Sequence, residues 1–183
     1  MTDLVVEKKR ENQLLEADMK EVITMLSGSY SIANQKPGLR FYEGDSDIKE
    51  LYNETLEVTD EILAFNGGTE EYFHQHLVGT IHQRLIKGVK KKIINEDTPL
   101  ARKHEIEYSK IPQNDALTEV KFISTNKYPF ESSVIVYNDV SVFLTLNKDT
   151  KLGFMIKSQE IANIHKSLFW HVWSELPEWD KKI

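Results

Sequence analysis

The stretch LRFYEGDSDIKELYNETL, Leu39 to Leu56, decides how this chain folds. A short alternating run ends at Gly44, acidic residues follow, and an amphipathic segment begins, which predicts a strand, a turn and a helix. The run EILAFN at 61–66 predicts a second strand, so the stretch opens a βαβ unit. A phosphate loop needs several glycines and usually a lysine, whereas EGDSD has one glycine and three carboxylates. The turn is therefore interpreted as a strand-to-helix corner.

The alternation of strand and helix continues beyond this unit. Thr69 to Gly88 predicts a second helix, VKKKIIN at 89–95 a third strand, and Pro99 after Thr98 the first turn of a third helix. The second helix has an inward stripe at Phe73, Leu77, Ile81 and Leu85.

Beyond Pro112 the pattern changes to short β-type runs. Four of them, at 117–124, 132–138, 140–147 and 151–158, predict an antiparallel meander with hairpins at YNDV and NKDT. Ser158 then caps a last helix, which we expect to pack through Ile161, Ile164, Leu168 and Val172. The fold class is α/β, with helices on a mixed sheet.

The segment before this domain has a different pattern. It carries a heptad seam without glycine or proline until Gly28, which predicts one long coiled-coil helix at 1–28 that pairs two subunits. The seam residues are Val5, Asn12, Leu15, Met19, Val22 and Leu26. The alternative is a helix that packs on its own domain. Turn-forming residues at 29–38 predict a linker, and 39–183 forms the α/β domain.

Composition excludes several classes of function. The 183 residues include no cysteine, which removes thiolate metal sites, thiol nucleophiles and disulfides. The histidines show no i,i+4 pair, so we expect no metal site and no cofactor. A net charge of −6 argues against nucleic-acid contact by this segment, and the absence of a long apolar run or signal peptide predicts a cytoplasmic protein that does not enter the membrane.

A ligand pocket is predicted at the carboxyl ends of the first three strands, where α/β sheets place ligands. Its candidate residues are Glu43, Asn66, Gly67, Thr69 and Asp97. Two other functions remain open: a small hydrolase that uses carboxylates near Glu43 and Asp97, and a protein interaction module that uses the acidic surface and the tail around Trp179.

Several stretches taken together resemble the effector-sensing part of TrmB-type transcriptional regulators. They are LRFYEGDSDIKELYNETL, EILAFNG, KYPFESSVIVYNDVSVFLTL and LGFMIKSQEIANIHKSLFWHVW, in the same order, and the resemblance spans Leu39 to Trp173. In that family a winged helix-turn-helix contacts DNA, a long helix pairs two subunits, and a phospholipase D-like domain senses a small molecule, often a sugar.

The resemblance implies a phospholipase D-like sandwich that serves as a regulatory domain of a homodimer, with a sugar or other metabolite as effector. No winged helix-turn-helix precedes Val5, so DNA would be contacted only through a domain absent from this chain. The His-x-Lys motif of phospholipase D-like enzymes is also missing, which implies a protein without catalytic residues.

Overall fold

The opening stretch forms strand β1 (Gly38–Glu43) and, directly after it, helix α2 (Gly44–Glu54). Gly44 has a φ of +79°, a left-handed conformation that glycine adopts without steric cost. Ile48, Leu51 and Tyr52 form the buried face of α2. The predicted strand, turn and helix are therefore confirmed.

The structure is a computed structural model, and it describes residues 38–58, 61–68, 70–76, 78–147 and 149–180. The predicted dimer helix at 1–28 and the linker lie outside the described residues, as do Thr69 and Leu77.

The remaining elements follow in chain order. They are η1 (Thr55–Glu57), β2 (Glu61–Asn66), α3 (Glu70–His76), α4 (Gly79–Ile86), β3 (Lys90–Glu96), α5 (Pro99–Ser109), α6 (Asn114–Leu117), β4 (Thr118–Ile123), β5 (Ser133–Tyr137), β6 (Val140–Leu146), β7 (Lys151–Lys157) and α7 (Gln159–Glu175). No helix in this part of the chain is both long enough and apolar enough to cross a membrane.

The strands form one mixed sheet of seven, in the order β1-β7-β6-β5-β2-β3-β4. β2, β3 and β4 are parallel neighbours, whereas β5, β6, β7 and β1 are joined by antiparallel pairings. β5 also runs antiparallel to β2, which joins the two halves. β1 and β2 therefore point the same way, as a βαβ unit requires, but three strands lie between them.

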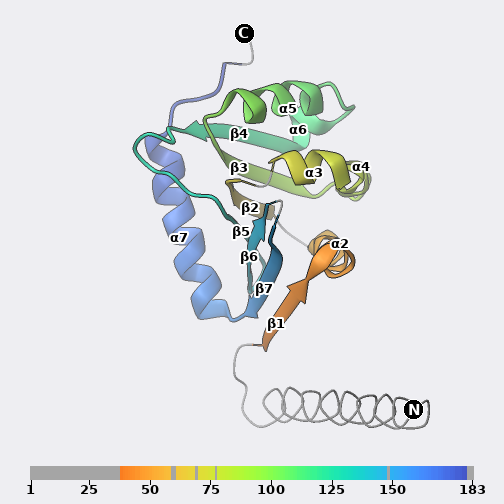
Figure 1. Ribbon diagram of the computed structural model, residues 1–183. Helices are drawn as coiled ribbons and strands as arrows, with labels where there is room; N and C mark the ends of the chain where they lie inside the picture. Colours follow the sequence, from red (N-terminus) through yellow and green to blue (C-terminus); the bar gives the residue numbers. More distant parts are fainter. Residues whose placement is uncertain (1–37, 59–60, 69, 77, 148, 181–183) are drawn as a thin grey trace, which may run out of the picture. The chain divides into compact units, whose positions relative to one another are not determined.

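Helices cover both faces of the sheet (Figure 1). α7 lies on one side, and α2, α3 and α4 lie on the other. The α2 side buries an apolar cluster that includes Tyr42, Leu51, Val142 and Leu144. The α7 side buries a second cluster, with Leu63, Ile94, Val136, Phe169 and Trp173 among its members. Successive residues of a strand alternate between these two layers.

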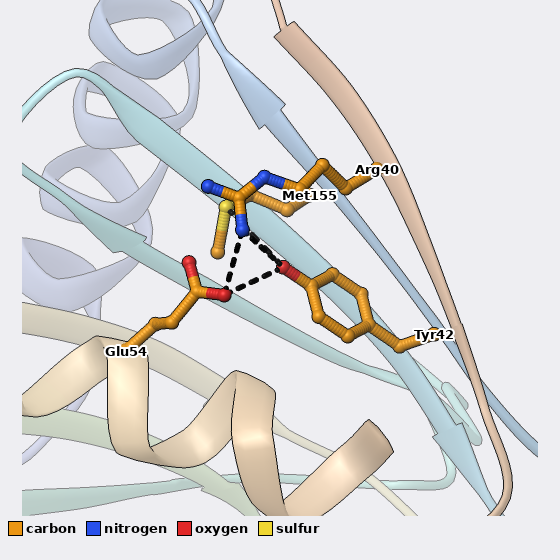
Figure 2. Close-up of polar contacts among 4 residues, drawn as sticks. All are labelled: Arg40, Tyr42, Glu54 and Met155. Carbon is orange, nitrogen blue, oxygen red and sulfur yellow. Dashed lines mark hydrogen bonds and ion pairs between the residues drawn. The ribbon is translucent and has the colours of Figure 1, made fainter. Parts of the chain in front are cut away.

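Three side chains of the opening stretch fasten α2 to β1 (Figure 2). Arg40 and the hydroxyl of Tyr42 both donate to Glu54 Oε1, at 2.8 and 3.0 Å. The same hydroxyl lies 3.9 Å from Met155 Sδ on β7. Burial, followed by the hydrogen bond to Glu54, raises the pKa of Tyr42 to about 12. The corner of the opening stretch therefore has a structural role: its side chains hold α2 against β1.

Local signals around the other elements are confirmed. Thr98 Oγ1 accepts a hydrogen bond from Ala101 N at 3.1 Å, and Ser158 Oγ accepts one from Ile161 N at 3.4 Å, so both residues cap their helices. Asn138 has a φ of 44° in the β5–β6 turn, where asparagine tolerates a left-handed backbone.

Strand β4 differs from the prediction. It was expected to begin the antiparallel meander, but it pairs in parallel with β3, with Ile93 opposite Val120. The physical reason is the connection between them: α5 and α6 supply a crossover long enough to bring the chain back in the same direction. The meander consists of β5, β6 and β7 only.

Two helices also differ. The predicted helix at 69–88 is divided into α3 and α4, and α4 begins at Gly79, a weak helix former. In α7 the buried residues are Ala162, Phe169 and Trp173, whereas Ile164 and Leu168 are 61% and 54% exposed. Aromatic rings bury more apolar area than isoleucine and leucine, and this decides which face of α7 packs inward.

Candidate functional site

A cavity of about 70 Å³ lies where α4 and α5 meet the parallel half of the sheet. That volume accommodates several water molecules or a small organic ligand. We call it the α4–α5 pocket. Its apolar lining includes Tyr52, Leu56, Ile62, Phe73, Ile81, Ile93 and Ile135. Its polar lining includes Asn66, Arg84, Lys91, Asn95, His104, Glu105, Tyr108, Asn114 and Thr118.

The alternation of β3 places polar side chains in this pocket. Lys91, Ile93 and Asn95 face it, and Ile94 belongs to the cluster under α7. On α5, His104, Glu105 and Tyr108 line the pocket, because residues three and four positions apart share a helix face, and Tyr108 is three from Glu105 and four from His104. The cap at Thr98 starts α5 so that this face meets the sheet.

Arg84 is buried and binds only neutral acceptors. Its guanidinium donates to the carbonyls of Val89 and Leu117 at 2.7 and 3.3 Å, to Asn114 Oδ1 at 3.1 Å and to Thr118 Oγ1 at 2.6 Å. Burial lowers the pKa of Arg84 to about 10, and the Glu105 carboxylate partly opposes this. Arg84 thus holds α4, α6 and β4 together and brings a positive charge to the pocket.

Lys91, on β3, is half-buried and lines the same pocket. Its Nζ is 5.9 Å from the centre of the Phe73 ring. Burial and then repulsion by Arg84 lower the pKa of Lys91 to about 8, and Glu105 opposes the shift. Among the described residues, the structure gives this ammonium no hydrogen-bond acceptor.

Glu105 is the acidic side chain of the lining. Its Oε1 accepts a hydrogen bond from Asn95 Nδ2 at 2.8 Å, and both partners are buried. This bond fixes α5 on β3. The lining therefore combines one carboxylate with the two cations Arg84 and Lys91.

His104 is also buried, and its ring stacks on His74 at 4.1 Å between centroids. His74 Nδ1 in turn lies 3.1 Å from the hydroxyl of Tyr108. Burial, and next the neighbouring His74, hold the pKa of His104 below its ordinary value. His104 Nδ1 is the buried side-chain nitrogen that has no hydrogen-bond partner in the described part of the chain.

The predicted site residues are not brought together in this pocket. Asn66 lines it. Gly67 N–H donates to Ser133 Oγ at 3.3 Å, and a Cβ added at Gly67 would come within 2.3 Å of Phe130 O, so glycine is required there for close packing. Thr69 lies outside the described residues.

The two predicted carboxylates lie apart from each other. Glu43 ends the edge strand β1 and is exposed, and its backbone N–H donates to Asp47 Oδ2 at 3.3 Å. Asp97 pairs with Arg102 through two hydrogen bonds at 2.6 and 3.0 Å. Four strands separate β1 from β3 in the sheet.

Most of the pocket was missed from the sequence. Lys91 and Asn95 were predicted only as parts of the third strand, and His104 and Glu105 were not considered as site residues. A usable signal is present: Asn95 continues the alternation of Lys91 and Ile93 into a strand that is buried on both faces. Among described residues, no group of three His, Asp or Glu side chains is placed to hold a metal ion.

Solved structures share this architecture. TrmBL2, an archaeal chromatin protein described as showing a novel mode of DNA binding, aligns over 94% of this chain and 67% of its own, with 17% identity and a TM-score of 0.58. Nuc from Salmonella typhimurium, a phospholipase D family member, aligns over 79% of this chain and 99% of its own, with 12% identity and a TM-score of 0.59.

NucT from Helicobacter pylori aligns over 79% of this chain and 100% of its own, with 11% identity and a TM-score of 0.57. No protein-family model matches the sequence, and no curated protein matches it either. At these identities the likeness establishes the fold. The chain thus has a phospholipase D-like α/β fold, which it shares with TrmBL2 as well as with Nuc and NucT.

Proposed function

We propose that this domain is the effector-binding domain of a TrmB-like transcriptional regulator and that it has no catalytic activity. The observation that carries the proposal is the α4–α5 pocket, which is partly open to solvent, partly apolar and lined by buried polar groups. Pockets with that combination are the usual sites for small molecules. The fold shared with TrmBL2, a protein whose structure shows DNA binding, supports the regulatory context.

The absence of catalytic activity is proposed because the side chains that a hydrolase of this fold would need are missing or lie far apart. The sequence has no His-x-Lys pair, the motif that the resemblance associates with phospholipase D chemistry. Glu43 and Asp97, the carboxylates that a small hydrolase would use, are separated by four strands, and Asp97 is paired with Arg102. The pocket itself offers one carboxylate, and paired acids would be needed for acid–base hydrolysis.

An effector would act through the elements that surround it. α3, α4 and α5 all contribute to the pocket lining, so a ligand that fits one arrangement of these helices better than another shifts the population toward that arrangement. The proposal assigns subunit pairing to the helix predicted at 1–28, DNA contact to a winged helix-turn-helix, and a cytoplasmic location to the protein.

The test compares two tryptophan substitutions on α4. Ile81→Trp fills the pocket, because Ile81 is buried in its lining, whereas Ile86→Trp adds the same ring at a side chain that is 85% exposed. Thermal unfolding is measured with a panel of sugars, organic acids, amino acids and nucleotides. We expect at least one compound to raise the melting temperature of the wild type and of Ile86→Trp, and to have no effect on Ile81→Trp.

Two results would contradict the proposal. One is a panel in which no compound stabilises the wild type. The other is turnover of a phosphodiester such as bis(p-nitrophenyl) phosphate by the purified protein that is lost in Glu43→Gln, because this would assign the fold a hydrolase role.

A further inference from the structure

The lysines on the two faces of the sheet have different surroundings. Lys92, which faces α7, pairs with Glu119 and lies 5.4 Å from the Trp173 ring. Lys121, also on that side, donates to the carbonyls of Trp173 and Leu176 at 3.1 and 2.9 Å. Lys91, which faces the α4–α5 pocket, lies over the Phe73 ring and within range of the charges of Arg84 and Glu105, and it has no hydrogen-bond acceptor among the described residues.

The charges of the pocket do not balance. Its lining carries the two cations Arg84 and Lys91 and the one carboxylate of Glu105. Arg84 donates its hydrogen bonds to neutral oxygens, and Glu105 accepts a hydrogen bond from Asn95. The one carboxylate of Glu105 acts on both cations, so a surplus of one positive charge remains in a partly buried site. An uncompensated charge away from water is costly, so a site with this balance favours a ligand that carries one negative charge.

A second observation also points to a ligand. His104 Nδ1 is buried without a hydrogen-bond partner among described residues, although buried polar atoms are nearly always bonded. It belongs to the same lining as Lys91. The rest of the wall is apolar, with Phe73, Ile81 and Ile93, which suits a hydrocarbon body more than a fully hydrated inorganic ion.

We infer that the α4–α5 pocket binds a small organic anion, with its charged group at Lys91 and its compact apolar body against Phe73, Ile81 and Ile93. This inference rests on the proposed effector-binding function and names the chemical class of the effector. The low pKa of Lys91 agrees with it, because an anion beside the ammonium would favour the charged form and return that pKa toward its ordinary value.

The experiment compares acids with amides of the same shape. Isobutyrate and lactate are the anionic probes, isobutyramide and lactamide are their neutral counterparts, and inorganic phosphate is a charged probe without an apolar body. Binding is measured by isothermal titration calorimetry and by thermal unfolding. We expect the two carboxylates to raise the melting temperature by about 3 °C or more at saturating concentration and the amides to leave it unchanged.

Lys91→Met and Lys90→Met are the matched variants. Lys90 is the exposed neighbour of Lys91 on the same strand. Loss of a charge-assisted hydrogen bond should weaken carboxylate binding about 10- to 100-fold in Lys91→Met and leave it unchanged in Lys90→Met. Lys91→Arg, which keeps the charge, should retain part of the affinity.

Three outcomes decide between the inference and the function on which it rests. If the amides bind as well as the acids and Ile81→Trp abolishes both, the effector is neutral, so the inference is overturned and the proposed function stands. If phosphate binds as tightly as the carboxylates, the apolar body contributes nothing and the organic part of the inference is wrong. If neither these probes nor the wider panel bind, the effector-binding function fails and the inference fails with it.

Discussion

The two faces of the sheet, compared along β3, bury different chemistry. Ile94 is fully buried among Phe169, Trp173 and other apolar side chains of the α7 layer. Asn95, the next residue, is equally buried but hydrogen-bonds to Glu105 in the α4–α5 pocket. The α7 face is a packed core, whereas the opposite face holds a cavity with charged groups beside it. One strand thus packs into an apolar layer through one face and lines a cavity with polar side chains through the other.

The largest effect is expected from the α7 face. Phe169 is 0% exposed and stacks on Trp173 with centroids 5.5 Å apart. Phe169→Ala should lower the free energy of unfolding by about 3–5 kcal/mol, because it removes a buried ring and leaves a cavity. Urea denaturation measures this. Trp170→Ala, at the neighbouring 43% exposed position, should cost clearly less, and equal losses would show that the packed core is not where the structure places it.

Arg84 tests the opposite face. Arg84→Met should lower the free energy of unfolding by about 2–3 kcal/mol, because the carbonyl of Val89 and the hydroxyl oxygen of Thr118 would lose the guanidinium that donates to them. Arg102→Met, which breaks the pair with Asp97 near the surface, should cost less than about 1 kcal/mol. A neutral result for Arg84→Met in urea denaturation would mean that its network contributes nothing to stability.

Lys91 should make stability depend on pH. Its folded pKa of about 8 lies below the ordinary value of 10.5, because burial and then the charge of Arg84 lower it and Glu105 only partly opposes them. Between these values the unfolded chain binds more protons, so stability should rise with pH through that window and be lowest below pH 8. Comparison with Lys91→Met isolates the contribution, which should approach about 3 kcal/mol across the window, because each pKa unit corresponds to about 1.4 kcal/mol. Parallel pH profiles of the two proteins would contradict the burial of a charged Lys91.

Tyr42→Phe should have a smaller effect. The substitution removes the hydroxyl that donates to Glu54 but keeps the ring in the α2 layer, so the loss should be about 1 kcal/mol. Tyr128→Phe, at a 59% exposed position, is the control and should be neutral. If thermal unfolding shows the same shift for both, the corner shown in Figure 2 does not fasten α2 to β1.

The smallest effect is expected on the outer side of α7. Ile164→Ser and Leu168→Ser should each change the free energy of unfolding by less than about 0.5 kcal/mol, because both side chains are more than half exposed. Analytical ultracentrifugation should give the same mass before and after the substitutions. A fall in stability or in mass would identify this side of α7 as an interface.

Much of the fold was predictable because its signals are local. Gly44, Pro99 in the first turn of α5, the cap at Ser158 and the turn at Asn138 each act within a few residues, and each was confirmed. Strand pairing was harder to predict from the sequence, because the partner of β4 depends on a crossover through α5 and α6. The inward face of α7 was misassigned because its apolar residues occupy two sides, and packing selects Phe169 and Trp173.

The candidate site was predictable only in part. The carboxyl ends of the strands suggested Asn66, which does line the pocket. Arg84, Lys91 and Glu105 come from three different elements, and their proximity depends on tertiary packing. From the sequence alone, a lysine in a strand is expected to face solvent. The packing of α4 and α5 against the sheet is what places Lys91 in the pocket lining.

The distance along the chain between β1 and β7 has a consequence for biosynthesis. Tyr42 and Met155, which meet in the folded domain, are 113 positions apart. At a translation rate of about 5–20 residues per second, β1 waits roughly 6–23 s after its own synthesis before β7 exists. During that interval Tyr42 and the apolar face of α2, which are buried in the folded domain, remain available to chaperones. Nascent chains arrested before Lys151 should therefore be held by chaperones longer than those arrested after Lys157.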